Sequence, residues 1–190
     1  MLESCKRITV DGIVQGVGFR PFVYRKAKKH DLNGYVRNEG GRVEIVVEGS
    51  EQQIDRFLQD LRSEKPARSR IDRLESQNIQ LAHYTDFSIV KSNASSTPKS
   101  ILVPDIGICK NCLAELSDPQ NRRYSYPFIS CTECGPRYTL VQSLPYDRHN
   151  TSMGSFQPCT TCHKEYAAPS DRRFHAQTVC CEECGPKLSF

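Results

Sequence analysis

The spacing of apolar residues in the amino-terminal half of the chain predicts β-strands. Apolar and polar residues alternate in three places: Ile8 and Val10; Val43, Ile45 and Val47; and Phe87 and Ile89. Successive side chains of a strand point to opposite faces of a sheet, so this alternation is typical of strands with one buried face. A further strand is predicted near Ile71 to Ile79.

Two helices are predicted between these strands. The first begins after Pro21 and runs to about His30, because the missing N–H group of proline is unpaired in a first helical turn in any case. The second begins at Ser50, since Gln53 completes a capping box three residues later. The second helix then shows an apolar stripe at helical spacing: Ile54, Phe57, Leu58 and Leu61.

The order of these elements is strand, helix, strand, strand, helix, strand, which is the ferredoxin-like plan. The predicted fold class is therefore α+β, with two helices packed on one face of an antiparallel sheet. Because this plan hosts many unrelated activities, the function has to be argued from a site.

Cysteine dominates the second half of the chain. Eight of the ten cysteines of the whole chain form four CxxC pairs, and the last two pairs repeat the first two after fifty residues: Cys109/Cys112, Cys131/Cys134, Cys159/Cys162 and Cys181/Cys184. Zinc takes four thiolates in a tetrahedron, and a CxxC turn supplies two of them. The pattern predicts a duplicated zinc-finger-like region with two structural zinc ions and repeats at about 109–134 and 159–184.

A disulfide framework is the alternative interpretation of these cysteines. Disulfides are favoured in small secreted domains, whereas this chain shows no charged-then-apolar signal segment at its start. We therefore expect zinc, a reducing cytoplasm, and free thiols at Cys5 and Cys180. The sequence leaves open whether the pairs combine sequentially or in a nested order, and whether Cys180 replaces Cys181 as a ligand.

Other residues recur in the same register as the cysteines. Glu115 recurs as Glu165, and the doubled arginine at 122–123 recurs at 172–173. We interpret the arginines as packing residues that bond to carbonyl groups near the cysteine pairs. His175 lies between the third and fourth pairs; a hydrogen-bonded structural role is favoured over a metal ligand or a channel wall.

Composition argues against two classes of partner. The longest apolar runs fall far short of the roughly 20 residues that a membrane helix needs, so no membrane partner is expected. The net charge is only +4, and no basic stripe is interleaved with aromatic residues, so nucleic-acid binding is not expected either.

A candidate phosphate site lies between the first strand and the first helix. Two glycines in this loop let backbone N–H groups turn toward one point, the helix start adds positive potential, and a guanidinium group supplies a fork of donors. The loop is Gln15, Gly16, Val17, Gly18, Phe19 and Arg20. Such a loop by itself is weak support for phosphate binding.

A second motif at the end of the second strand strengthens the case. Gly12-Ile13-Val14-Gln15-Gly16-Val17-Gly18-Phe19-Arg20 and Gly34-Tyr35-Val36-Arg37-Asn38 resemble the two signatures of the acylphosphatase family. The resemblance implies an acylphosphatase sandwich in which Arg20 binds the phosphoryl group of an acyl phosphate and Asn38 orients the attacking water. The turn after Asn38 is a residue shorter than in the small free-standing enzymes.

The combination of both halves resembles the start of the HypF family, the hydrogenase maturation carbamoyltransferases. The implied organisation is an acylphosphatase-like domain at 1–91, a linker at 92–104 and the duplicated finger region at 105–190. The resemblance implies hydrolysis of carbamoyl phosphate by this portion, with ATP used only in carboxy-terminal domains that this chain lacks and with HypE as the partner of the full-length protein. The alternative is a non-catalytic module that binds substrate and docks other proteins.

Overall fold

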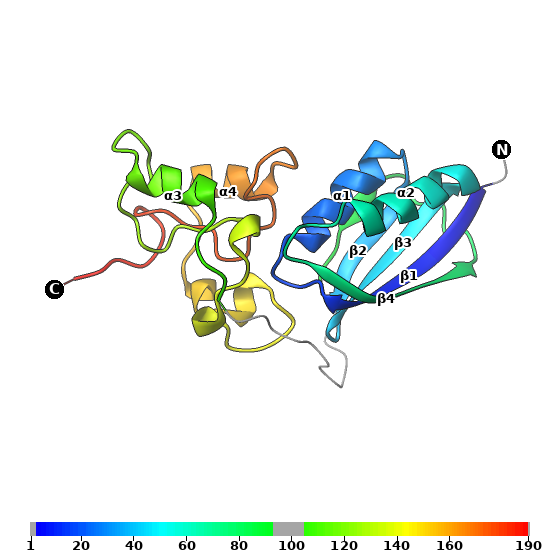
Figure 1. Ribbon diagram of the computed structural model, residues 1–190, viewed down its shortest axis with the longest axis horizontal. Helices are drawn as coiled ribbons and strands as arrows, with labels where there is room; N and C mark the ends of the chain where they lie inside the picture. The colour runs from blue at the N-terminus through cyan, green and yellow to red at the C-terminus, as the bar shows by residue number, and fades with distance from the viewer. Residues whose placement is uncertain (1–2, 93–104, 190) are drawn as a thin grey trace.

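The computed structural model describes residues 3–92 and 105–189, which form two regions side by side (Figure 1). The first region contains β1 (Glu3–Ile13), α1 (Phe19–Lys29), β2 (Asn33–Glu39), β3 (Arg42–Ser50), α2 (Glu51–Ser63), β4 (Arg70–Ile79) and β5 (Phe87–Ile89). The second contains α3 (Lys110–Ser117), four 3-10 turns, η1 (Thr132–Cys134), η2 (Tyr138–Leu140), η3 (Arg148–Asn150) and η4 (Ser152–Ser155), and α4 (Thr160–Ala167). Of the predicted linker, all but Ser92 lies outside the described residues.

The first region is one five-stranded sheet covered on one face by two helices. The strand order is β4-β1-β3-β2-β5. Ile45 of β3 pairs with Ile8 of β1 on one side and with Val36 of β2 on the other, and all three side chains are buried. This apolar row packs against the buried faces of α1 and α2, which lie over the sheet in Figure 1. The predicted α+β class is confirmed.

The sheet differs from the prediction at one edge, because β5 pairs with β2 in parallel and the sheet is therefore mixed. β4 ends beside Cys5, at the start of β1, and β5 begins beside Gly34, at the start of β2. The chain thus crosses the sheet at one end and enters β5 in the direction of β2. On the way, the N–H groups of His83 and Tyr84 donate to the buried Glu48 carboxylate over 3.2 and 2.8 Å.

Both predicted helices are present. α2 has the predicted capping box, in which the Gln53 N–H group donates to the Ser50 hydroxyl and the Ser50 N–H group donates to the Gln53 side chain. α1 begins at Phe19, three residues earlier than predicted, after Gly18 in the left-handed conformation with φ 75°. Pro21 lies in the first turn, where its lack of an N–H group leaves no helical hydrogen bond unmade.

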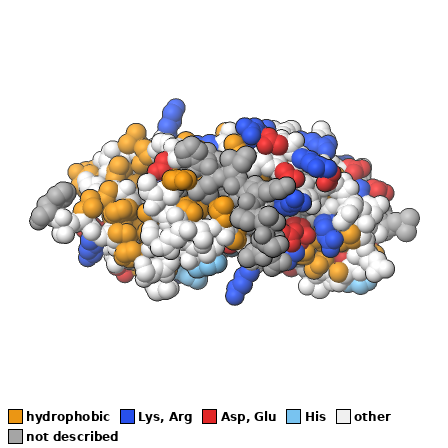
Figure 2. Space-filling view, turned by 90° about the horizontal axis from the view of Figure 1, so that it is seen from below, with side chains coloured by type: hydrophobic (Ala, Val, Ile, Leu, Met, Phe, Trp, Pro, Cys, Tyr) orange, Lys and Arg blue, Asp and Glu red, His pale blue; other side chains and the backbone are white. Residues whose placement is uncertain are grey.

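The second region has little regular structure and a small core. Its two α-helices follow directly after Cys109 and Cys159, so each repeat opens in the same way. Buried cysteines and a few apolar side chains fill the interior. In Figure 2, hydrophobic side chains gather on this half of the surface, while charges of both signs are spread over the other half. Among the described residues, we find no helix with the length and apolar character of a membrane span.

Candidate functional site

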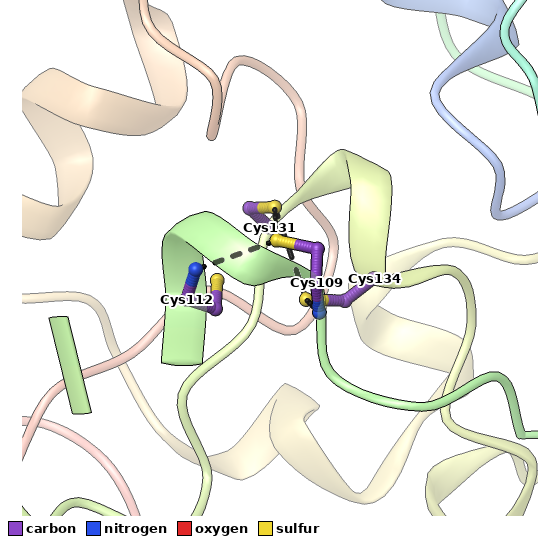
Figure 3. A group of neighbouring side chains, drawn as sticks. All are labelled: Cys109, Cys112, Cys131 and Cys134. Atoms are coloured by element: carbon purple, nitrogen blue, oxygen red, sulfur yellow. Dashed lines mark hydrogen bonds between the residues drawn. The ribbon is translucent and has the colours of Figure 1, made fainter. Parts of the chain in front are cut away.

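The eight paired cysteines gather into two groups, and each group uses the two pairs of one repeat. Within a group, all four Sγ atoms lie within 4.8 Å of one another: Cys109, Cys112, Cys131 and Cys134 in the first (Figure 3), and Cys159, Cys162, Cys181 and Cys184 in the second. The structure therefore has the sequential arrangement. It places Cys181 in the second group and leaves Cys180 outside, buried beside the Tyr126 hydroxyl at 3.4 Å.

Local structure brings the first four sulfur atoms together. Cys109 is the N-cap residue of α3, and its Sγ accepts the N–H group of Cys112 over 3.4 Å. The N–H group of Cys109 lies 3.5 Å from the Sγ of Cys134, which ends η1. Amide hydrogens aimed at sulfur stabilise the thiolate, the form of cysteine that binds metal.

The distances between sulfur atoms suit a metal with four thiolate ligands. They are 3.6 Å for Cys109 and Cys131, 3.9 Å for Cys131 and Cys134, and 3.8 Å for both Cys159 to Cys181 and Cys181 to Cys184. Two sulfurs of a tetrahedral site with bonds of about 2.3 Å stand about 3.8 Å apart. None of the ten cysteines forms a disulfide. The donor set and its spacing therefore fit zinc.

Each cysteine group is contacted by an arginine from the other repeat. Arg122 of the first repeat donates to the Sγ atoms of Cys181, Cys159 and Cys162 over 3.0, 3.3 and 3.4 Å: it thus reaches three of the four sulfurs of the second group. Arg172 of the second repeat donates in return to the Sγ of Cys112 over 3.1 Å. The two repeats therefore exchange guanidinium groups.

The second arginine of each pair holds the repeats together. The Nε atom of Arg123 donates to the Cys180 carbonyl over 2.8 Å, and that of Arg173 donates to the Ser130 carbonyl over 3.2 Å, as the sequence interpretation expected. In addition, Arg123 pairs with Glu165 and Arg173 with Glu115, again between repeats. Burial acts to raise the pKa of Glu115, but hydrogen bonds from Arg173 and Arg172 outweigh it and hold that pKa below its ordinary value.

The loop that was predicted to bind phosphate, called the phosphate loop below, lies between β1 and α1. Gly16 and Gly18 both have positive φ, 72° and 75°, a conformation that glycine adopts without strain. No side chain caps α1, and among the described residues the backbone N–H groups of residues 16–20 have no backbone acceptor. Amides at a helix start that lack protein acceptors are suited to bind an anion.

Gln15 connects this loop to the second predicted motif. Its side chain donates to the carbonyl of Arg42 over 3.4 Å, and Arg42 pairs with Glu39, the residue after Asn38. Asn38 is fully buried near the end of β2, and its side-chain nitrogen and oxygen have no hydrogen-bond partner among the described residues. An unpartnered buried amide is costly for folding and needs an explanation outside stability.

Arg20 is buried at the boundary between the two regions. Its Nη2 atom lies 2.8 Å from the Asp147 carboxylate and donates to the Tyr146 carbonyl over 3.2 Å. The Tyr146 N–H group lies 3.4 Å from the Gln15 side chain, so the same segment contacts both ends of the phosphate loop. The contacts place the phosphate loop against the finger region.

A small cavity and a larger groove meet at Arg20. The cavity has a volume of about 30 Å³ and is lined by Gly16, Gly18 and Thr132 among others. The groove, of about 470 Å³, extends from Arg20 past Lys91 and His149. A cavity needs about 10–15 Å³ for one water molecule, so the cavity holds little more than water as it stands.

His175 lines both spaces and belongs to neither cysteine group. Its ring packs against those of Tyr166 and Phe174, with centroids 4.9 and 4.7 Å away, and makes no hydrogen bond within the described residues. The hydrogen-bonded role that the sequence favoured is therefore wrong, since aromatic packing holds this ring. Burial, and then the charge of Arg20, lowers the pKa of His175 to about 4, so the imidazole is neutral near pH 7.

Sequence reasoning missed the partners of Arg20. Tyr146 and Asp147 lie between the two repeats, in a stretch outside the repeated register, and no motif marks them. It also missed the contacts of Arg122 and Arg172 with sulfur, although the recurrence of the arginine and glutamate positions was visible. That recurrence was the one available signal, because it showed that these residues belong with the cysteines.

Comparisons with known proteins match both regions. Residues 6–89 match the acylphosphatase family model, and residues 108–141 and 159–190 match the HypF finger model. The probable carbamoyltransferase HypF of Methanocaldococcus jannaschii is 54% identical over 76% of this chain and 19% of its own length. An acylphosphatase of Mannheimia succiniciproducens is 47% identical over 41% of this chain and 87% of its own length. The chain thus spans about a fifth of the length of the HypF relatives.

Solved structures agree with these matches. A full-length HypF in a phosphate- and nucleotide-bound form superposes with a TM-score of 0.91 and 46% identity, over 99% of this chain and 25% of that one. The HypF of T. kodakarensis gives a TM-score of 0.84 and 51% identity, over 96% of this chain and 23% of that one. The arrangement of the two regions against each other is therefore shared with these structures.

Proposed function

This chain belongs to the HypF family, of which it carries the acylphosphatase and finger domains, and on that premise we propose that it hydrolyses carbamoyl phosphate. Two observations carry the proposal: Arg20 is buried at a helix start that no side chain caps, and the buried amide of Asn38 has no hydrogen-bond partner among the described residues. In the full-length protein the carbamoyl group would pass to ATP-dependent domains and then to HypE. The setting is the cytoplasm.

The chain's own residues suffice for the chemistry. Arg20 and the loop amides bind the phosphoryl oxygens and balance the negative charge that grows on them in the transition state. Asn38 accepts a hydrogen bond from water and aims its oxygen at phosphorus. A P–O bond forms with that water, the P–O bond to the carbamoyl group breaks, and carbamate leaves with the electron pair. A phosphate oxygen takes the proton of the water, because an amide is no base.

Asn38→Ala tests this assignment. We expect phosphate release from carbamoyl phosphate to fall about a hundredfold, as when one positioned hydrogen-bonding group of a transition state is removed. The melting temperature should stay the same or rise, because the change removes two buried polar atoms that have no hydrogen-bond partner within residues 3–92 and 105–189. Release is measured by a continuous phosphate assay, and Asn78→Ala on the exposed face of β4 is the matched control.

The outcome distinguishes a catalytic role of the Asn38 amide from a purely structural role. If Asn38→Ala loses stability and keeps its activity, then the side chain serves the fold and the catalytic assignment is wrong. If the unaltered chain itself releases no phosphate above background, the hydrolytic proposal fails for this chain.

A second candidate function is substrate binding without turnover. Arg20 already has a carboxylate partner from the finger region, and the cavity beside it is small. In that case carbamoyl phosphate binds to the chain in calorimetry with no phosphate released. Equal binding by the unaltered chain and by Arg20→Ala would instead place the ligand elsewhere.

We further propose that each cysteine group holds one structural zinc ion, with the eight paired cysteines as ligands. A zinc ion with four thiolates carries a net charge of −2, so a nearby guanidinium stabilises it. Arg122 serves the second site in this way and Arg172 serves the first. The zinc supplies folding energy to a region whose apolar core is small.

The exchange of arginines predicts selective metal loss. Arg122→Ala should weaken zinc binding in the second site about 10- to 100-fold, the usual cost of losing a group that supports the ligands, and spare the first site. Arg172→Ala should do the opposite. The transfer of zinc to a chelator that changes colour on binding is followed over time. In each variant, one zinc ion should be released quickly and the other slowly. Arg73→Ala on exposed β4 is the control, and equal release rates for both ions in each variant would contradict the assignment.

A further inference from the structure

The guanidinium group of Arg20 is held by residues from outside its own domain core. It pairs with the Asp147 carboxylate, and both side chains are only 10% exposed. Asp147 is the only acidic partner of Arg20 among the described residues. The remaining contacts are with the Tyr146 carbonyl at 3.2 Å and the Ser92 hydroxyl at 3.4 Å. Asp147 is therefore the one group there whose charge matches that of a phosphoryl group.

Asp147 is presented by an anchored loop. The Asn150 N–H group donates to the Asp147 carbonyl over 2.8 Å, and the Asn150 side chain donates to the Pro145 carbonyl over 2.7 Å. Next to it, Arg148 donates to the carbonyls of Gln177 and Phe156 over 2.9 and 2.7 Å. These bonds fix the carboxylate against Arg20 from the finger side.

A carboxylate and a phosphoryl group compete for the same donors. Both accept parallel hydrogen bonds from the fork of a guanidinium, and two anions repel each other when they share a cation at short distance. We propose that Asp147 acts as an internal competitor for Arg20, and that the phosphoryl group of the acyl phosphate must displace its carboxylate. This rests on the proposed function, because it takes Arg20 as the phosphoryl-binding residue.

The competition has two consequences. Phosphate binds only to molecules in which the Arg20–Asp147 ion pair is broken. The apparent affinity for phosphate is therefore the intrinsic affinity multiplied by the fraction of such molecules. Ligand binding also releases the Asp147 carboxylate, and with it the loop that bonds to Gln177 of the second repeat. Occupancy of the hydrolytic site is thereby transmitted to the finger region.

Calorimetric titration with inorganic phosphate tests the competition without any need for turnover. Asp147→Asn keeps the size of the side chain and removes its charge, so we expect the dissociation constant for phosphate to fall about tenfold. Asp118→Asn removes the same charge from an exposed helix end of the finger region and should change nothing. Unchanged or weaker phosphate binding in Asp147→Asn overturns the proposal.

A measurement on the unaltered chain covers the case in which the variant does not fold. Saturating phosphate should speed hydrogen exchange at the amides of Asp147, Asn150 and Thr151, whose bonds belong to the loop. Slower or equal exchange there would mean that the pair survives ligand binding, and would overturn the proposal. Neither experiment measures hydrolysis. Both results can therefore be interpreted even if the catalytic assignment of Arg20 and Asn38 is wrong.

Discussion

Replacing Arg20 by alanine is expected to lower phosphate release from carbamoyl phosphate about a thousandfold, since an arginine that stabilises a phosphoryl transition state is worth 10³–10⁵ in rate. The structure offers the ligand no second guanidinium in the loop, because Arg20 is the only arginine between residues 14 and 24. Release is followed in the same phosphate assay. Arg25→Ala, on the exposed side of the same helix, should keep full activity.

The Arg20 variant needs a control for folding. Truncation leaves the Asp147 carboxylate buried without its partner, and an uncompensated buried charge costs about 3–5 kcal/mol. The double variant Arg20→Ala/Asp147→Asn removes that charge as well. We expect it to melt near the temperature of the unaltered chain and to remain inactive. Recovery of phosphate release in the double variant would show that Arg20 acts only by neutralising Asp147.

Loss of zinc is expected to unfold the finger region and to leave the sheet region folded. Structural zinc contributes roughly 10–16 kcal/mol in small zinc domains, far more than the few buried apolar side chains of this region supply. Cys112→Ser, or a strong chelator, should therefore abolish protection from hydrogen exchange in residues 105–189. Residues 3–92 have their own apolar core and should stay protected.

Cys180→Ala is the matched control for the zinc experiment. Cys180 is buried, adjoins Cys181 and lies outside both cysteine groups, so its loss should cost only the packing of one side chain and its contact with the Tyr126 hydroxyl. Protection that persists across 105–189 after metal removal would contradict the structural role of zinc. Because Asp147 belongs to the finger region, its unfolding should also free Arg20, and phosphate should then bind more tightly.

Short-range patterns in the sequence were enough to predict the helices, the strands and the residue types of the candidate sites. The strands around Ile8 and Ile45 were recognised from the two-residue period of their apolar side chains. The start of α2 was recognised from the three-residue spacing of Ser50 and Gln53. The loop from Gln15 to Arg20 and the eight cysteines were visible for the same reason. Their chemistry depends on residue types a few positions apart, and such spacings are read directly from a sequence.

The tertiary structure alone decided which distant groups meet. The direction of β5 depended on where the chain crosses the sheet, and the sequential grouping of the cysteines depended on how each repeat closes. Arg122 and Cys181 are 59 residues apart, and Arg20 and Asp147 are 127 apart, a separation over which no local pattern acts. These contacts are set by the packing of whole regions against each other. The sequence by itself thus determined which residue types make up the candidate sites, while the fold determined which distant residues contact them.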